Sequence, residues 1–164
     1  MWNLLNQILN DFKGCFSRQT SFKWFAIIII GFMLRSDSLG VTSVIRDLNL
    51  SHSSYATIIH FFHSSSWKLE VIAKKWTEIV KGFAPIYQED GVTILVGDGV
   101  NASKEARKMP GVKKLHQESE NSSKGEYILG HTFGGIGVIV GNNSKLFCIP
   151  LFINIQDGIK TIRS

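Results

Sequence analysis

The stretch Val92-Thr93-Ile94-Leu95-Val96-Gly97-Asp98-Gly99-Val100 decides the fold of the second half of this chain. Its first five residues form a short apolar run, which predicts a buried strand over 92–96. Asp98 follows between two glycines, which permit a sharp turn and the close approach of a phosphate. Because carboxylates are preferred Mg²⁺ ligands, Asp98 is a candidate metal-binding and catalytic residue. The same residues are also ordinary in a strand-to-loop turn, where Asp and Gly are both frequent.

Two more strands are predicted after this stretch. Residues 127–140 are apolar and glycine-rich, the segment 141–144 has the composition of a hairpin turn, and 146–155 is again apolar. The intervening residues 101–125 are polar and basic and show no packing period. We therefore expect a strand, a long polar segment and a β-hairpin.

The first half of the chain has apolar residues at helical spacing. This period predicts a series of helices, over residues 2–12, 21–34, 41–48, 53–62 and 68–81. The period changes near residues 82–89, so the expected domains are a helical, possibly DNA-binding region over 1–85 and a sheet region over 86–164. Together these elements place the chain in the α+β class.

Length, charge and cysteine content set further bounds. The chain has 164 residues and a formal net charge of +5, which permits a polyanionic partner without requiring one. Cys15 and Cys148 lie far apart, so neither a disulfide framework nor a zinc site is expected, and a reduced intracellular compartment fits better. The apolar run 24–34 is shorter than the roughly 20 residues of a membrane span and is expected to be a core helix.

The segment 41–63 has the proportions of a helix-turn-helix, with an apolar stripe, a four-residue break and a second helix. In such a unit the start of the second helix reaches DNA bases and phosphates. The candidate DNA-binding residues here are Arg46, His52, Ser53, Ser54 and Tyr55. The alternative is an ordinary helical hairpin, since the second helix contains no Lys or Arg.

A second basic group follows Asp98 along the chain. It consists of Lys104, Arg107, Lys108, Lys113 and Lys114. Next to a metal-binding carboxylate, these side chains would hold phosphates of a DNA strand. The alternative is a solvated surface loop, which is the usual setting of a charge run.

A family resemblance extends these interpretations. The runs 97–100, 103–105, 107–124, 126–128, 130–131 and 145–151, together with 39–46 and 60–62 upstream, resemble bacterial insertion-sequence transposases of the DDE class. The resemblance covers the chain from about Trp24 onward, and the run from Gly97 to Lys124 is its most specific part.

The resemblance implies a ribonuclease-H-like mixed sheet that opens with three antiparallel strands, the first ending in a catalytic Asp. In that family three carboxylates hold two Mg²⁺ ions that promote DNA strand cleavage and transfer, and Asp98 matches the first carboxylate. The second Asp and the Glu of the family lie further downstream than Ser164. We therefore expect an N-terminal fragment of a transposase that is inactive alone and binds Mg²⁺ only in a completed site.

The same resemblance implies partners and a location. The expected partners are the DNA termini of the element, and a full-length transposase or its C-terminal part. No membrane association is expected, and the expected location is the bacterial cytoplasm at the nucleoid.

Other functions remain open from the sequence. The chain could be a DNA-binding module without catalysis, an inhibitor of a full-length transposase, or a relic. The residues around Asp98 also resemble the Gly-Asp-Gly-x-Asn-Asp segment of haloacid-dehalogenase-type phosphatases. However, Ala102 replaces the second acidic residue of that segment, and no Asp-Lys-Thr-Gly motif occurs upstream.

Overall fold

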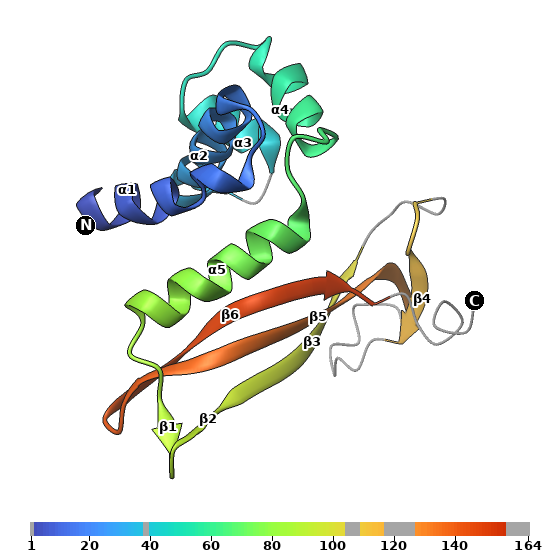
Figure 1. The fold of residues 1–164 in the computed structure, drawn as a ribbon. Coiled ribbons are helices and arrows are strands. Elements are labelled where there is room, and N and C mark those ends of the chain that lie inside the picture. Colours follow the sequence, from blue (N-terminus) through green and yellow to red (C-terminus); the bar gives the residue numbers. More distant parts are fainter. Residues whose placement is uncertain (1, 38–39, 104–108, 117–126, 157–164) are drawn as a thin grey trace. The chain divides into compact units, whose positions relative to one another are not determined.

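The computed structural model describes residues 2–37, 40–103, 109–116 and 127–156. The chain divides into two compact units, Met1–Gly82 and Phe83–Ser164, which we call the helical unit and the sheet unit. The fold is α+β, with helices in the first unit and an antiparallel sheet in the second (Figure 1).

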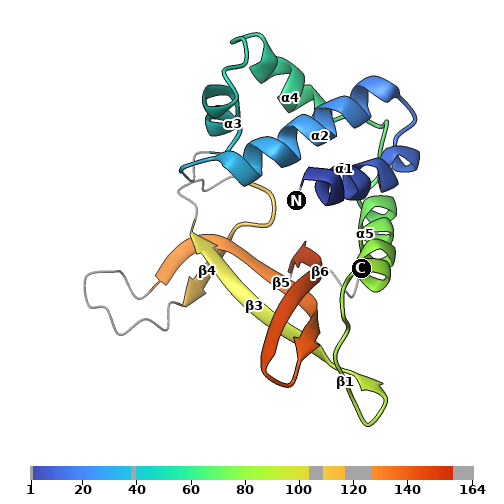
Figure 2. The ribbon, with the colours of Figure 1, turned by 90° about the vertical axis from the view of Figure 1, so that its left-hand side faces the viewer.

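The helical unit follows the apolar period of the sequence. Its elements are α1 (Trp2–Asp11), the short 3₁₀ helix η1 (Lys13–Cys15), α2 (Gln19–Leu34), α3 (Val41–Asp47), α4 (Ser54–Phe62) and α5 (Leu69–Phe83). Helices α2, α3 and α4 pack against one another. Figure 2 shows α3 and α4 on one side of α2 and α1 on the other.

One apolar core holds the helical unit together. Phe12 and Phe25 contact each other with ring centroids 5.2 Å apart, and Phe16 lies 5.0 Å from Phe25. Val44 and Ile58 are each only 1% exposed. Helix α2 meets α3 at Gly31, where any Cβ would overlap Cγ1 of Val44, so the absence of a side chain permits this close packing.

Helix α2 contains the apolar run that the sequence analysis assigns to a core helix. It has 16 residues, and Phe22, Phe25, Ile28 and Gly31 are buried on it. Among the described helices, none is both long and apolar enough to cross a membrane.

The sheet unit contains a short hairpin and a larger antiparallel sheet. Its strands are β1 (Gln88–Glu89), β2 (Val92–Thr93), β3 (Leu95–Ser103), β4 (Lys113–His116), β5 (Tyr127–Asn142) and β6 (Lys145–Ile155). Strand β1 pairs with β2, and β5 pairs with β3, β4 and β6. Figure 1 shows β3, β5 and β6 running side by side as long strands.

The register shows that β5 is the central strand. Gly130 of β5 pairs with Ser103 on one edge and Lys113 on the other, while Gly135 pairs with both Asp98 and Ile153. Strand β3 therefore lies on one edge of β5, and β6 and β4 follow each other along the opposite edge.

The predicted buried strand over 92–96 is wrong in its extent and in its burial, because Val92 is 66% exposed and Leu95 is 59% exposed. The strand is interrupted at Ile94, which separates β2 from β3. Because β3 extends to Ser103, Asp98 lies within a strand rather than at its end. Gly97 and Gly99 do not turn the chain; they pair with Ile136 and Gly134 of β5, and neither has a positive φ. Strand β4 also forms inside the segment 101–125, for which no strand was expected.

Candidate functional site

Asp98 lies on the edge strand β3 with its carboxylate exposed to solvent. Its Oδ1 accepts a hydrogen bond of 2.7 Å from the backbone N–H of Gly99. No ion pair engages this carboxylate among the residues that the structure describes. Oδ2 is therefore open to a cation that approaches the edge of the sheet.

A shallow groove of about 700 Å³ on the sheet includes Asp98 in its lining. Gly97, Gly99 and Gly134 form its floor, and Phe152, Asn154 and Gln156 of the β6 end border it. We call it the glycine groove. The side-chain amide of Gln156 lies directly over Gly134, where any Cβ would overlap it.

Asp98 belongs to the lining of the glycine groove, but strand alternation directs its side chain to the face opposite that of Gly97 and Gly99. Side chains alternate along a strand, and directly paired residues share a face. Gly97 and Gly99 share a face with Ile136 and Gly134, whereas Asp98 shares the other face with Gly135 and Ile153. The floor of glycines thus exposes backbone on one face, and the carboxylate projects from the other.

The two described lysines of the basic segment do not lie beside Asp98. Lys113 and Lys114 pair with Gly130 and Leu129, whereas Asp98 pairs with Gly135. The nearer lysine and Asp98 are therefore five residue steps apart along β5, about 17 Å at the usual rise of a strand, and the two lie on opposite edges of β5.

Both lysines also have contacts within the sheet unit. Nζ of Lys113 donates a hydrogen bond of 2.5 Å to the carbonyl of Gln156, which joins β4 to the β6 end of the glycine groove. Nζ of Lys114 lies 4.2 Å from the centroid of the Tyr127 ring, a cation–π contact. The other three predicted residues, Lys104, Arg107 and Lys108, lie outside the described residues.

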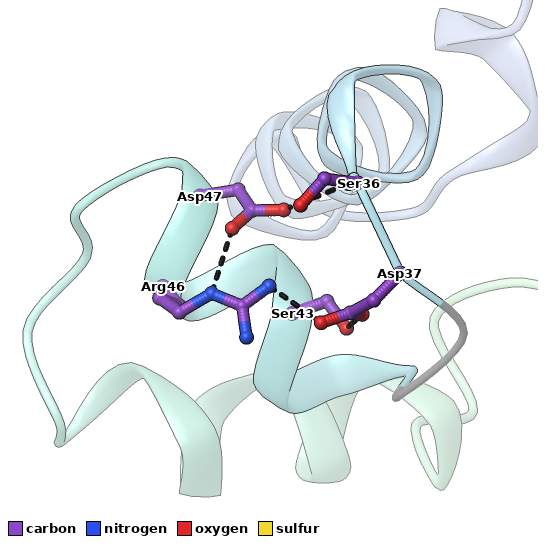
Figure 3. Close-up of polar contacts among 5 residues, drawn as sticks. All are labelled: Ser36, Asp37, Ser43, Arg46 and Asp47. Atoms are coloured by element: carbon purple, nitrogen blue, oxygen red, sulfur yellow. Dashed lines mark hydrogen bonds and ion pairs between the residues drawn. The ribbon is translucent and has the colours of Figure 1, made fainter.

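In the helical unit, Arg46 is engaged by two carboxylates (Figure 3). Its guanidinium lies 2.6 Å from Oδ2 of Asp37 and 2.9 Å from Oδ1 of Asp47. Asp47 also accepts a hydrogen bond of 3.1 Å from the N–H of Ser36, and Ser43 donates one to Asp37. We call these five residues the Arg46 network, which ties α3 to the segment that follows α2.

The Arg46 network changes the acid–base properties of its members. The hydrogen bond to Asp37, followed by the one to Asp47, raises the pKa of Arg46. The hydrogen bond from Arg46, with that from the Ser36 N–H, lowers the pKa of Asp47. In this arrangement two carboxylates of the same unit compensate the positive charge of Arg46 at the protein surface, and Arg46 connects α3 to the segment that follows α2.

The other predicted DNA-binding residues of the helical unit surround the start of α4. His52, Ser53 and Tyr55 are exposed there, but Ser54 is only 9% exposed and faces the interior. Oγ of Ser51 lies 2.8 Å from Oγ of Ser53 and 3.2 Å from Oγ of Ser54. The structure thus brings three of the five predicted residues to one exposed helix end, and it engages Arg46 and Ser54 elsewhere.

Asn154 and Gln156 were not predicted as site residues. The alternation of Phe152, Asn154 and Gln156 was a signal in the sequence, because it places these side chains on one face of a strand. What the sequence did not show is the glycine floor opposite them, which depends on the pairing of β5 with both β3 and β6.

Residues 11–139 match the family model of the DDE superfamily endonucleases, which is more than half of the chain. The chain therefore belongs to the DDE superfamily endonuclease family. Members of this family act on DNA and generally use divalent metal ions. No curated protein and no solved structure matches the chain.

Proposed function

We propose that this protein is a transposase of the bacterial insertion-sequence type, and that Asp98 is the first metal-binding carboxylate of its DNA-cleaving site. The family match supports this proposal because the matched residues 11–139 include Asp98. The exposed carboxylate, with Oδ2 facing solvent, supports it further. Family membership also favours this function over the phosphatase alternative.

The proposed metal is Mg²⁺, which requires several oxygen ligands around Asp98. Mg²⁺ takes octahedral oxygen coordination through carboxylates, phosphates and water. Within the described parts of the chain, no group of three or more His, Cys, Asp and Glu side chains lies close enough to hold a metal. Asp98 alone does not hold the ion firmly, so we derive no chemical step through the metal and assign Asp98 as one ligand of a site that other carboxylates complete.

The proposed substrate is DNA, at the ends of a mobile element. Three exposed side chains at the start of α4, His52, Ser53 and Tyr55, are proposed to contact it. Lys113 and Lys114 are proposed to contact phosphates further along the sheet, away from Asp98. Lys104, Arg107 and Lys108 remain in the proposal on the sequence alone. We also place the protein at the nucleoid in the bacterial cytoplasm, as a transposase requires.

A second candidate function needs no catalysis by this chain. No group of three or more potential metal ligands occurs among the described residues, and this favours it because Asp98 alone leaves a two-metal site incomplete. In this case the chain binds DNA ends, or associates with a full-length transposase or its C-terminal part, and either completes or inhibits it. DNA binding without cleavage distinguishes this candidate from the first.

The first experiment tests Asp98 as a metal ligand without relying on activity. Mn²⁺ replaces Mg²⁺ at oxygen sites and broadens the NMR signals of nearby nuclei. We expect titration of the full chain with Mn²⁺ to broaden the Gly99 amide selectively, and Asp98→Asn to abolish this effect. Asp90→Asn is the matched control, because Asp90 is an exposed carboxylate of the same unit outside the proposed site.

The same proteins are then incubated with DNA and Mg²⁺. Cleavage by the wild-type chain that is lost in Asp98→Asn and kept in Asp90→Asn supports catalysis by this chain. Broadening without cleavage supports the second candidate, in which another polypeptide completes the site. Equal broadening in wild type and Asp98→Asn contradicts the assignment of Asp98.

A further inference from the structure

The helical unit contains a pocket that the proposed site residues do not use. It has a volume of about 190 Å³ and lies between the start of α2 and the second half of α4. Arg18 and His60 contribute the basic groups of its lining, Thr20, Ser21, Thr57 and Ser64 contribute hydroxyls, and Trp24 contributes an aromatic wall. We call it the Arg18 pocket. Its lining includes no Asp or Glu among the described residues.

A chain of hydroxyl groups connects two residues of the pocket lining, Ser64 and Ser21. Ser64 donates a hydrogen bond of 2.8 Å to Oγ of Ser66, and Ser66 donates one of 2.7 Å to Oγ of Ser21. Ser66 is only 6% exposed, so the chain runs through the interior. Because each hydroxyl donates to the next, the proton of Ser21 remains available for an acceptor in the pocket. Hydrogen bonds in such a chain polarise one another, which makes the last hydroxyl a better donor.

The two basic residues differ from Arg46 in their surroundings. Arg46 has its charge compensated by Asp37 and Asp47. No ion pair or side-chain hydrogen bond engages Arg18 or His60 in the described part of the chain, and both are exposed. The pocket thus presents a guanidinium, an imidazole and hydroxyl donors without a compensating acid, which is the donor set that suits an anion.

We propose that the Arg18 pocket binds a phosphate of the DNA backbone, an inference that rests on the DNA substrate of the proposed function. A volume of about 190 Å³ admits one phosphate group but is below the 300–1,000 Å³ that is usual for pockets holding larger ligands. Arg18 supplies the fork of N–H donors that matches two phosphate oxygens, and Ser21 supplies a further donor. Trp24 offers an apolar wall to the adjoining sugar. The DNA contact of the helical unit thereby includes Arg18, at the start of α2, in place of Arg46.

The test measures DNA affinity of the full chain as a function of salt, with a fluorescent duplex and a fluorescent single strand as probes. Arg18→Gln removes the guanidinium of the pocket. Arg35→Gln is the matched control, because Arg35 directly follows the opposite end of α2 and lies over the ring of Phe32. Circular dichroism confirms that both variants keep their helices.

We expect Arg18→Gln to weaken DNA binding about 3- to 10-fold near 0.1 M salt. We also expect it to reduce the slope of log affinity against log salt by about 0.9 for duplex DNA, as the loss of one phosphate contact requires. Ser21→Ala should weaken binding less and leave the slope unchanged, because it removes a neutral donor. Arg35→Gln should leave the slope at the wild-type value.

The outcomes separate this inference from the proposed function. Suppose that the wild type binds DNA, and that the Arg18→Gln and Arg35→Gln variants match each other in DNA affinity and in salt slope. The pocket assignment is then overturned while the DNA substrate stands. A third outcome is that inorganic phosphate changes the tryptophan fluorescence of the wild type but not of Arg18→Gln, while the DNA affinity is the same in both. In that case the pocket binds a small free anion and the DNA contact is overturned. If the wild type binds no DNA, both fail, and the Mn²⁺ test of Asp98 is judged separately.

Discussion

The two units of this chain differ in how much apolar surface they cover. In the helical unit, Val44 and Ile58 are 1% exposed and ten apolar residues form one buried cluster. In the sheet unit, Val138 and Val140 are the buried apolar residues of the described strands, whereas Ile136 is 49% exposed and Phe147 is 63% exposed. Apolar surface contributes to stability only when folding removes it from water. Burial of apolar side chains therefore contributes more to the stability of the helical unit than to that of the described sheet.

The largest effect that we expect from this difference is the loss of unfolding free energy when a buried isoleucine is replaced by alanine. Ile58→Ala removes a fully buried side chain from α4 and leaves a cavity, so it should destabilise the helical unit by about 2–5 kcal/mol. All four tryptophans, at positions 2, 24, 67 and 76, lie in this unit, so tryptophan fluorescence during urea unfolding reports on it alone.

The matched change in the sheet unit is Ile136→Ala on β5. Because this side chain is half exposed, the cost should stay below about 1 kcal/mol, the range of strand propensities. Amide hydrogen exchange of β5 measures it. Equal costs for the two isoleucine substitutions would mean that the sheet unit covers Ile136 in solution, and the comparison between the units would not hold.

Smaller changes in stability, of opposite sign, are expected when two helix glycines are replaced by alanine. A Cβ at Gly31 would overlap Val44, so Gly31→Ala should destabilise the helical unit by about 1–3 kcal/mol through overpacking. A Cβ at Gly82 meets nothing within 4 Å, so Gly82→Ala should stabilise it by up to about 1 kcal/mol through helix propensity. Urea unfolding followed by tryptophan fluorescence compares both. Two stabilising substitutions would show that α2 and α3 pack less closely than described.

The helices could be predicted from the sequence because helical spacing is local information. The apolar stripe over 41–48 corresponds to α3 (Val41–Asp47), and the run over 21–34 corresponds to most of α2. The strand that carries Asp98 was predicted only in part. Gly97 and Gly99 have the composition of a turn, but they pair with Ile136 and Gly134, which lie 39 and 35 residues further along the chain. Strand β4 depends in the same way on its pairing with β5.

The candidate site was predictable as a set of residues but not as an arrangement. The sequence identified Asp98 through its flanking glycines, and the family match includes this residue. It placed Lys113 and Lys114 near Asp98 because they follow soon along the chain, but the register of β5 separates them. It predicted Arg46 as a DNA-binding residue, whereas the structure pairs Arg46 with Asp37, nine residues earlier in the chain.

The smallest effect concerns acid pH and the Arg46 network. The folded protein lowers the pKa of Asp47, chiefly through the hydrogen bond from Arg46. A carboxylate with a lowered pKa in the folded state contributes stability that is fully present above its unfolded pKa of about 3.9 and lost as pH falls through the folded value. Asp47→Asn should therefore destabilise the helical unit at pH 6, and the difference from wild type should shrink as the pH is lowered toward 2.

Tryptophan fluorescence during urea unfolding at each pH measures this difference, with Asp11→Asn as the control because Asp11 is an exposed carboxylate outside the network. A difference between wild type and Asp47→Asn that is the same at pH 6 and pH 2 would show that the ion pairs of Figure 3 do not form in solution, and it would return Arg46 to the residues available for DNA.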